Sequence, residues 1–160
     1  FNMNIKLIVV GKTVKSYFTE AEEEYLKRLK HYIKVNYIVI PELKNTKNLS
    51  VDVIKNKEGE LIQKHLNNTD SVWLMDEKGK HKTSVEFSQF LQQKMNQGTK
   101  DLVFIIGGAF GFSDEIYKKY NSKLSLSKMT FSHQMIRTFL LEQVYRGMSI
   151  IKNQPYHNEG

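Results

Sequence analysis

The feature that most constrains the fold is an alternation of short apolar runs with segments of helical periodicity. The runs are rich in Val, Ile and Leu, and they predict β-strands because branched side chains favour extended backbone. Strands that alternate with helices form βαβ units, so the sequence predicts an α/β fold: a mostly parallel sheet of five to six strands with helices on both faces. The expected strands cover residues 4–10, 35–40, 71–75, 101–106 and 123–127.

The segments between these runs carry signals for where helices begin and end. Thr19 with Glu22, and Thr83 with Glu86, have the spacing of a capping box, which predicts a helix start at each Thr. Gly98 is expected to end the second of these helices. The other helices are expected from about 50 to 66, from near 113, and over 135–152.

The last expected helix is the longest. Five of its apolar residues share one face, which predicts that this face is buried. They are Ile136, Phe139, Leu140, Val144 and Met148. Pro155 follows the helix and leaves a short tail, YHNEG.

Length and composition bound the organisation of the chain. Its 160 residues suit one domain, and we expect a single domain over residues 1–160, with Met3 as the natural start after Phe1 and Asn2. The sequence has no cysteine, which excludes disulfides, thiolate catalysis and cysteine-ligated zinc. No apolar stretch approaches the roughly 20 residues of a membrane helix. We therefore expect a cytoplasmic protein, and the lack of cysteine fits a reducing compartment.

The charge balance points to an anionic partner. The net charge is +7 and the pI is about 9.4, with Lys and Arg distributed along the whole chain. A compact, evenly basic domain often meets a polyanion such as nucleic acid. A solvated basic surface without a specific partner is the other interpretation.

Three strand ends are the expected place for a ligand, because parallel sheets bind ligands beyond the carboxyl ends of their strands. Their sequences are LMDEKGK after the third run, IIGGAFG after the fourth and LSLSKMTFSHQ after the fifth. The first continues into residues 76–82, which have the composition of a turn.

The glycines of IIGGAFG invite a comparison with phosphate-binding loops. A Walker A loop requires Lys followed by Ser or Thr, and neither pair follows these glycines. A dinucleotide fingerprint follows the first strand and has a carboxylate about 20 residues on, whereas this loop follows a late strand and reaches KLSLSKM at that distance. Two interpretations stay open: a tight turn that needs positive φ, and a gap in side chains through which backbone contacts a flat ligand such as adenine.

The C-terminal third closely resembles one family. The segments IGG, LSLSKMTFSHQMIRTFLLEQVYRGMSI and PYH, together with IKLIVVGK and KEGE at residues 57–60, are similar to the RlmH family of SPOUT-class methyltransferases. The resemblance covers the chain from Met3 onward. It implies a C-terminal trefoil knot, S-adenosylmethionine as methyl donor without a metal, and methylation of N3 of a pseudouridine in 23S ribosomal RNA. It also implies a homodimer in which the partner completes each active site.

The resemblance implies that the cofactor lies at the same three strand ends and is held largely by backbone groups. Met129 and Phe131 are expected to provide apolar walls. The implied cofactor-binding residues are Leu74, Met75, Asp76, Gly107, Gly108, Ser127, Lys128, Met129, Thr130, Phe131 and Ser132.

The chemistry of the implied substrate calls for a base or an anion stabiliser, because an imide nitrogen becomes a good nucleophile only as its proton leaves. Our candidates are His133, Arg137, Tyr156 and His157. Arg137 lies four residues after His133 and shares its helix face, and it could stabilise an enolate-like oxygen although it cannot act as a base. Tyr156 and His157 match the family's C-terminal YH, expected at the substrate side. Without the resemblance, we would interpret His133 as a helix cap or as a hydrogen-bonding residue of the core. The tail with Tyr156 and His157 would be interpreted as a frayed terminus.

The expected RNA contacts are basic residues near these loops. Lys78, Lys80 and Lys82 flank the first loop, where solvated lysines are an equal interpretation. Arg146 could contact either phosphate or a second subunit. Relatives usually carry a basic residue after YH, whereas Asn158 stands there in this chain.

That departure keeps a second function open: a non-catalytic basic dimer that binds RNA or ribosomes and retains the fold. A third possibility, a dehydrogenase using another nucleotide, is disfavoured by the position of the glycines and the missing ribose carboxylate.

Overall fold

A computed structural model describes residues 2–158. The expectations about the start and the tail of the chain rest in part on three residues that lie outside the described residues: Phe1, Glu159 and Gly160. Strands and helices alternate along the described chain. The strands are β1 (Asn4–Val10), β2 (Lys34–Ile40), β3 (Ser71–His81), β4 (Asp101–Ile106) and β5 (Lys123–Ser125). The helices are α1 (Ser16–Leu29), α2 (Val51–Gln63), α3 (Ser84–Asn96), α4 (Asp114–Lys119) and α5 (Met135–Ile151).

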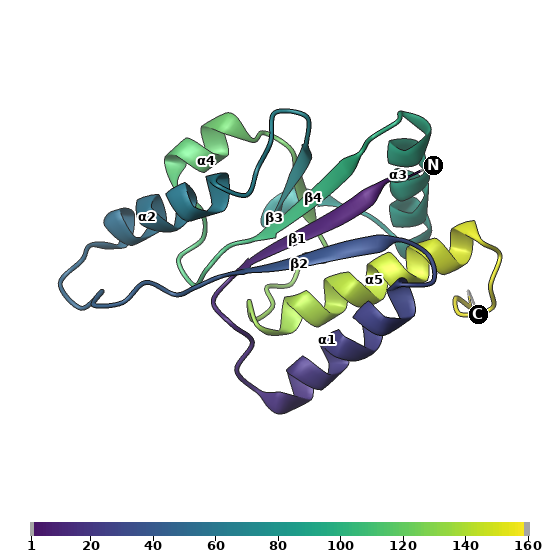
Figure 1. The fold of residues 1–160 in the computed structure, drawn as a ribbon, viewed down its shortest axis with the longest axis horizontal. Helices are drawn as coiled ribbons and strands as arrows, with labels where there is room; N and C mark the ends of the chain where they lie inside the picture. The colour runs from purple at the N-terminus through teal and green to yellow at the C-terminus, as the bar shows by residue number, and fades with distance from the viewer. Residues whose placement is uncertain (1, 159–160) are drawn as a thin grey trace.

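The strands form one sheet in the order β2-β1-β4-β3-β5, and every neighbouring pair is parallel (Figure 1). This confirms the predicted α/β fold with a parallel sheet. Because all strands run the same way, their carboxyl ends share one edge of the sheet, and the loops that follow β3, β4 and β5 are neighbours there.

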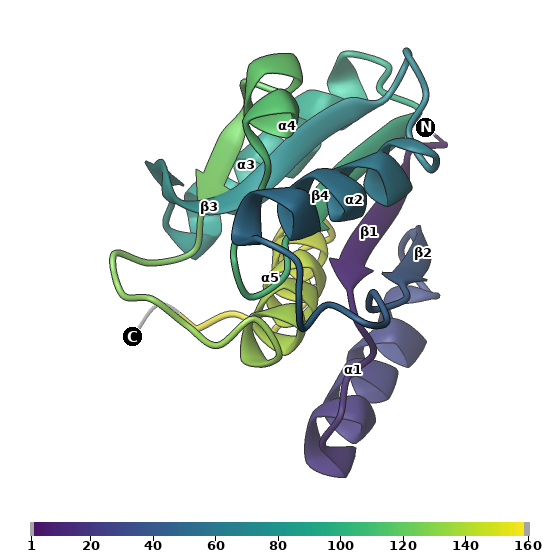
Figure 2. The same cartoon turned by 90° about the vertical axis from the view of Figure 1, so that its left-hand side faces the viewer.

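The sheet separates two hydrophobic cores, because successive strand residues point to opposite faces. On β1, Leu7 and Val9 belong to the core covered by α1, α3 and α5, whereas Ile8 and Val10 belong to the core covered by α2 and α4 (Figures 1 and 2). All four side chains are at most 4% exposed. Both faces are thus covered, as the predicted pattern required.

The two predicted capping boxes had different outcomes. The box of Thr83 and Glu86 is present in both directions and begins α3. The box of Thr19 and Glu22 is wrong: α1 begins at Ser16 and has no side-chain cap. Glu22 is instead only 6% exposed and accepts hydrogen bonds from the Thr13 and Tyr37 hydroxyls.

The turn predicted at residues 76–82 is also wrong, since β3 continues to His81. Met75 and Lys80 both pair with Leu124 of β5, so the strand arches out between two stretches of pairing. Gly79 explains the close approach: a Cβ there would lie 2.6 Å from the Leu124 nitrogen.

The buried face predicted for α5 is confirmed in part. Leu140, Val144 and Met148 are at most 2% exposed, whereas Phe139 is 37% exposed and Ile136 is half-buried. None of the helices in residues 2–158 is both long and apolar enough to cross a membrane.

Candidate active site

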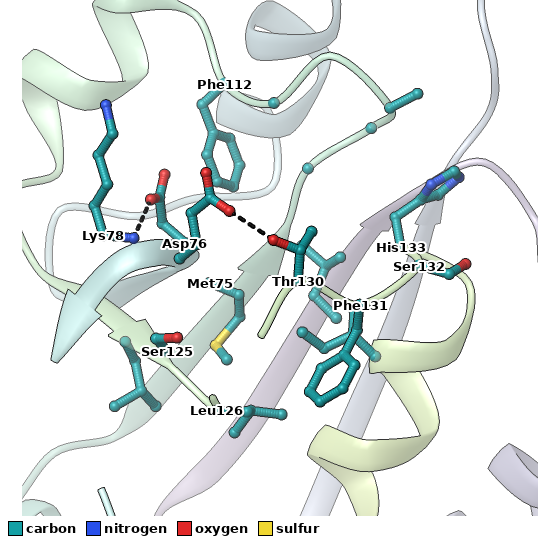
Figure 3. A pocket seen from close by; sticks show the side chains of 18 of the residues that line it. Met75, Asp76, Lys78, Phe112, Ser125, Leu126, Thr130, Phe131, Ser132 and His133 are labelled. Atoms are coloured by element: carbon teal, nitrogen blue, oxygen red, sulfur yellow. Dashed lines mark hydrogen bonds between the residues drawn. The ribbon is translucent and has the colours of Figure 1, made fainter. Parts of the chain in front are cut away.

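A cavity of about 540 Å³ opens at the carboxyl edge of the sheet, beside the arch of β3 and beyond the ends of β4 and β5 (Figure 3). Its walls come from residues 75–78, 106–112, 124–127 and 129–133, together with Tyr117 of α4 and Ile136 of α5. The three strand ends identified from the sequence therefore meet around one space.

Most of the expected cofactor residues line this cavity. Leu74 is fully buried within the sheet, where it pairs with Ile105, and Lys128 is exposed, so neither of these two faces the cavity. The expected residues that do line it are Met75, Asp76, Gly107, Gly108, Ser127, Met129, Thr130, Phe131 and Ser132.

The glycines after β4 serve two different needs. Gly111, at φ +82°, supplies the left-handed turn, and its N–H donates to the Gly108 carbonyl at 3.1 Å. Gly107 and Gly108 have ordinary φ but little room for a side chain: a Cβ at Gly107 would lie 3.2 Å from the Phe112 ring, and one at Gly108 would lie 3.0 Å from a Glu58 carboxylate oxygen. The positive-φ interpretation thus holds for Gly111, and contact of backbone with a flat ligand stays a prediction for Gly107 and Gly108.

A polar network holds one wall of the cavity. The Asp76 carboxylate accepts from the Tyr117 hydroxyl and from the Lys78 N–H at 2.8 Å. Burial, then the hydrogen bond to Asp76, raises the pKa of Tyr117, so this phenol is a neutral donor. Thr130 donates to Glu77 at 2.9 Å and so ties the loop after β5 to β3 (Figure 3). Tyr117 and Glu77 were missed from the sequence, because no motif marks a residue that reaches a site from a helix or an arch.

His133 stands at the opposite side of the cavity from Asp76 (Figure 3). Its side chain is half-buried. Desolvation, then the positive charge of Arg137, lowers the pKa of His133, while Glu42 opposes the shift. The imidazole is therefore neutral near pH 7 and able to accept a proton.

Arg137 lies behind the cavity rather than in it. Its side chain is fully buried, and its guanidinium donates to the carbonyls of Val10, Gly11 and His133 at 2.8, 2.7 and 3.1 Å and to the Thr13 hydroxyl at 3.1 Å. These bonds point the guanidinium at the end of β1, so the geometry does not place it against a substrate in the cavity.

Tyr156 and His157 do not line this cavity either; they pack on the second half of α5. Glu142 is the centre of this group: it accepts from Tyr156 at 2.9 Å and from Arg146 at 2.8 Å. Arg146 also lies 3.1 Å from His157 Nδ1 and 4.7 Å from the centroid of the Tyr156 ring. A further bond joins the hydroxyls of Tyr156 and Tyr25 at 3.0 Å.

The lysines expected to contact RNA occupy different surroundings. Lys78 lines the cavity rim, and Lys80 is exposed on the arch of β3. The Lys82 ammonium lies 5.4 Å from the centroid of the Phe90 ring and borders a second cavity of about 500 Å³. The apolar lining of that second cavity includes Phe87, Leu126, Phe131 and Phe139.

S-adenosylmethionine fits the first cavity by the chemistry of its walls. Backbone without side chains is presented at Gly107 and Gly108, which suits a flat purine. Met129, 74% exposed, and Phe110, 53% exposed, offer apolar surface at the rim. Asp76 provides carboxylate oxygens for hydroxyl or ammonium groups.

The chain was compared with known proteins. A family model described as "Predicted SPOUT methyltransferase" matches residues 3–157. Two relatives named "Ribosomal RNA large subunit methyltransferase H", from Flavobacterium johnsoniae and Parabacteroides distasonis, are each 55% identical over 157 residues, which is 98% of this chain and 100% of theirs.

Solved structures share the fold at low sequence identity. A protein from Neisseria gonorrhoeae described as a methylase family member superposes with a TM-score of 0.53 and 15% identity, over 99% of this chain and 87% of that one. A "probable methylase family protein" from Haemophilus influenzae gives 0.51 and 8%, over 99% and 72%. With its fold, its cavity at the strand ends and a match over residues 3–157, the chain belongs to the SPOUT methyltransferase family.

Proposed function

We propose that this protein uses S-adenosylmethionine to methylate N3 of a pseudouridine in 23S ribosomal RNA. The observation that carries the proposal is the cavity in which three strand ends converge, with bare backbone at Gly107 and Gly108 and a neutral histidine at its edge. The name of the relatives supports the substrate class. The knot and the cytoplasmic location implied by the resemblance, and a single domain over residues 1–160, are parts of the same proposal.

The cofactor supplies an electrophilic methyl group on a sulfonium centre. The main chain of residues 107–108, 127 and 129–132 would hold its adenosine portion, with Met129 and Phe131 as apolar surface beside it. Asp76 would accept hydrogen bonds from its polar groups, and the bond of Thr130 to Glu77 ties the loop after β5 to the wall formed by β3.

His133 is our candidate for the group that receives the imide proton. It borders the cavity, and its lowered pKa keeps it neutral at the pH of a cell. A positioned base of this kind typically contributes about 10²–10⁴-fold to the rate. Arg137 is buried and bonded to backbone carbonyls, so we propose for it an indirect role, argued in the next subsection.

A homodimer would bring the tail to an active site. Phe139 is 37% exposed and lies with Phe131 in the apolar second cavity, which suits contact with a second copy. Tyr156 and His157 lie away from the cavity of their own chain, so we propose that they serve the partner's site. Substitution of Phe139 by Arg should produce monomers in analytical ultracentrifugation; an unchanged sedimentation coefficient would refute this interface.

RNA contacts are proposed for Lys78, Lys80, Lys82 and Arg146. Lys78 and Lys80 stand on the arch beside the cavity, where they can meet phosphates without rearrangement. The substrate is proposed to be the assembled ribosome, because one small domain needs a large preformed surface to gain specificity. Methylation of naked RNA as fast as of ribosomes would contradict this.

The decisive experiment is a transfer assay with tritiated S-adenosylmethionine on ribosomes from a strain that lacks the enzyme. We expect label in 23S RNA, and mapping of the modified nucleotide to pseudouridine N3. No binding of the cofactor in calorimetry would refute the proposal.

Asn158, in place of a basic residue after His157, favours one second candidate: an RNA-binding protein without turnover. Cofactor binding with no label in ribosomes, and with tight ribosome binding, would support this candidate over the first.

A further inference from the structure

We infer that Arg137 is a positioning residue that fixes the His133 main chain against the end of β1. It does so as part of a buried chain of hydrogen bonds, here called the relay. The relay runs from Arg137 through the Thr13 hydroxyl to Glu22 and Tyr37. This inference deepens the proposed function and rests on it for the role of His133. The relay joins α5 to the loop after β1, to α1 and to β2.

The guanidinium is the centre of the relay. Nη1 donates to the Gly11 carbonyl at 2.7 Å and Nη2 to the Val10 carbonyl at 2.8 Å, while Nε donates to the His133 carbonyl at 3.1 Å. One planar group thus bonds the last residues of β1 and the residue at the edge of the cavity. A lysine could not do the same, because its ammonium lacks this rigid fork of donors.

The Thr13 hydroxyl passes the connection onward. It accepts from Arg137 Nη1 at 3.1 Å and donates to the Glu22 carboxylate at 2.7 Å. Tyr37 donates to the other carboxylate oxygen at 2.8 Å, and burial, as the largest cause, raises the pKa of Tyr37 to about 12. Tyr37 therefore remains a donor, and the relay places a buried cation and a buried carboxylate at its two ends.

A second set of hydrogen bonds, made by Gln134, lies beside those of Arg137. The Gln134 side chain accepts from the Val14 N–H at 2.9 Å and donates to the Lys12 carbonyl at 3.2 Å. Residues 133–137 are therefore attached to residues 10–14 by side chains that bond backbone. Val10 is the last residue of β1, and the Gly11 N–H donates to the Ile40 carbonyl of β2 at 2.6 Å, so the partners of Arg137 are fixed by the sheet. Lys12 and Val14, the partners of Gln134, belong to the loop that follows.

The position of His133 is what this attachment controls. His133 ends the loop that lines the cavity, and its carbonyl is bonded by Arg137. A displacement of about 1 Å in a catalytic group can lower a rate about 10²-fold. Two charged groups face the imidazole, Arg137 from α5 and Glu42 from the segment after β2, and they act on its pKa in opposite directions.

The test uses Thr13→Val, which breaks the relay without removing a charge, and Thr138→Val as the matched control. The Thr138 hydroxyl is buried on α5 and makes no hydrogen bond within residues 2–158, so its loss leaves the relay intact. We expect Thr13→Val to lower the single-turnover methyl-transfer rate roughly tenfold while the Kd for S-adenosylmethionine changes less than about twofold. Equal rates for the two variants would overturn the inference.

Arg137→Lys and Arg137→Met separate charge from geometry. NMR titration of the histidine ring, assigned with His133→Gln, should give an unchanged His133 pKa in the Lys variant and a raised pKa in the Met variant. The transfer rate should fall in both, because neither retains the fork. A raised KM for ribosomes at unchanged kcat would overturn the inference, since it would mean that Arg137 contacts RNA.

The NMR titration does not depend on turnover. If the parent protein transfers no methyl group, the proposed function fails, but a His133 ring signal that shifts in Thr13→Val and not in Thr138→Val still supports the relay. If Arg137→Met does not fold, Thr13→Val carries the test alone, and a His133 ring signal identical to that of the parent protein counts against the relay.

Discussion

The two ends of α5 hold their polar side chains in opposite ways. At the first end, Arg137 is fully buried and bonds mostly backbone carbonyls. At the second end, Arg146 and Glu142 pair at 2.8 Å with side chains 25% and 18% exposed, and their other partners are side chains: Gln143 of α5, and Tyr156 and His157 of the tail. The first arrangement is fixed by the sheet, whereas the second depends on partly exposed side chains, which could exchange partners with the proposed RNA or second subunit.

This difference shows that the start of α5 is held rigidly, whereas the side chains near its end and in the tail can adapt. A proton acceptor needs a fixed position, and His133, for which we propose that role, lies at the fixed end. A group that must meet another molecule needs freedom, and Tyr156 and His157, which we propose to serve the partner's site, lie at the adaptable end.

The largest expected effect is on the methyl-transfer rate, and it comes from a substitution at the fixed end of α5. His133→Ala should lower the methyl-transfer rate by about 10²–10⁴-fold, because the imide proton would lose its acceptor. Single-turnover assays measure the rate, and calorimetry should give nearly unchanged cofactor affinity. Full activity would remove His133 from the mechanism.

The next effect concerns stability. Arg137→Met should lower the free energy of unfolding by about 3–5 kcal/mol, because removal of one partner leaves buried carbonyls and the Glu22 carboxylate uncompensated. Urea denaturation measures it. The double variant Arg137→Met/Glu22→Gln is the control and should recover part of the loss; no recovery would show that the relay is not one coupled unit.

The pH dependence of the methyl-transfer rate tests the role of His133 at the fixed end of α5. Since the pKa of His133 is lowered from about 6.5, the neutral base is fully present at about pH 7. The rate should fall roughly tenfold per pH unit once the pH drops below that lowered pKa. A rate profile between about pH 5 and 8 tests this, and a midpoint above about 6.5 would contradict it.

A smaller effect is expected at the loop that leads to the fixed end. Thr130→Val removes the exposed hydrogen bond to Glu77 and should weaken cofactor binding by roughly two- to tenfold, as expected for the loss of about 0.5–1.5 kcal/mol. Calorimetry measures the Kd. Thr138→Val is the comparison: it makes the same change outside the cavity, at a hydroxyl without a hydrogen-bond partner within residues 2–158, and leaves the bond to Glu77 intact.

The smallest effect is expected at the adaptable end. Arg146→Met should change the free energy of unfolding of the isolated protein by only about 0–1 kcal/mol, because the side chains of this ion pair are partly exposed and screened by water. Urea denaturation beside Arg137→Met gives the direct contrast. Equal losses in the two variants would erase the distinction between the two ends.

Much of the fold could be predicted because its signals are local. The apolar runs of β1 and β4 and the Thr83 cap each depend on a few neighbouring residues. The arch of β3 could not be predicted, because Gly79 looks like a turn residue until its contact with Leu124 is known.

The site was predictable where backbone forms it and less so where buried charges support it. The glycines marked the cavity through their place after a late strand. Arg137 and Glu22 were taken for a catalytic and a capping residue, because periodicity treats charged residues as exposed and cannot show that both lie within one buried network. Nor can spacing show that Tyr156 packs on Glu142, since a tail carries no repeating pattern.

The arch of β3 has one further consequence. Because Met75 and Lys80 share Leu124 as partner, residues 76–79 are an insert that the sheet does not need for its pairing. Side chains alternate along a strand, so the loss of Asp76 alone would place Glu77 next to Met75, at the position that Asp76 now occupies. The chain can thus alter the chemistry of its cavity wall by changing the length of one segment, while the strands on either side, and the core beneath them, stay in register.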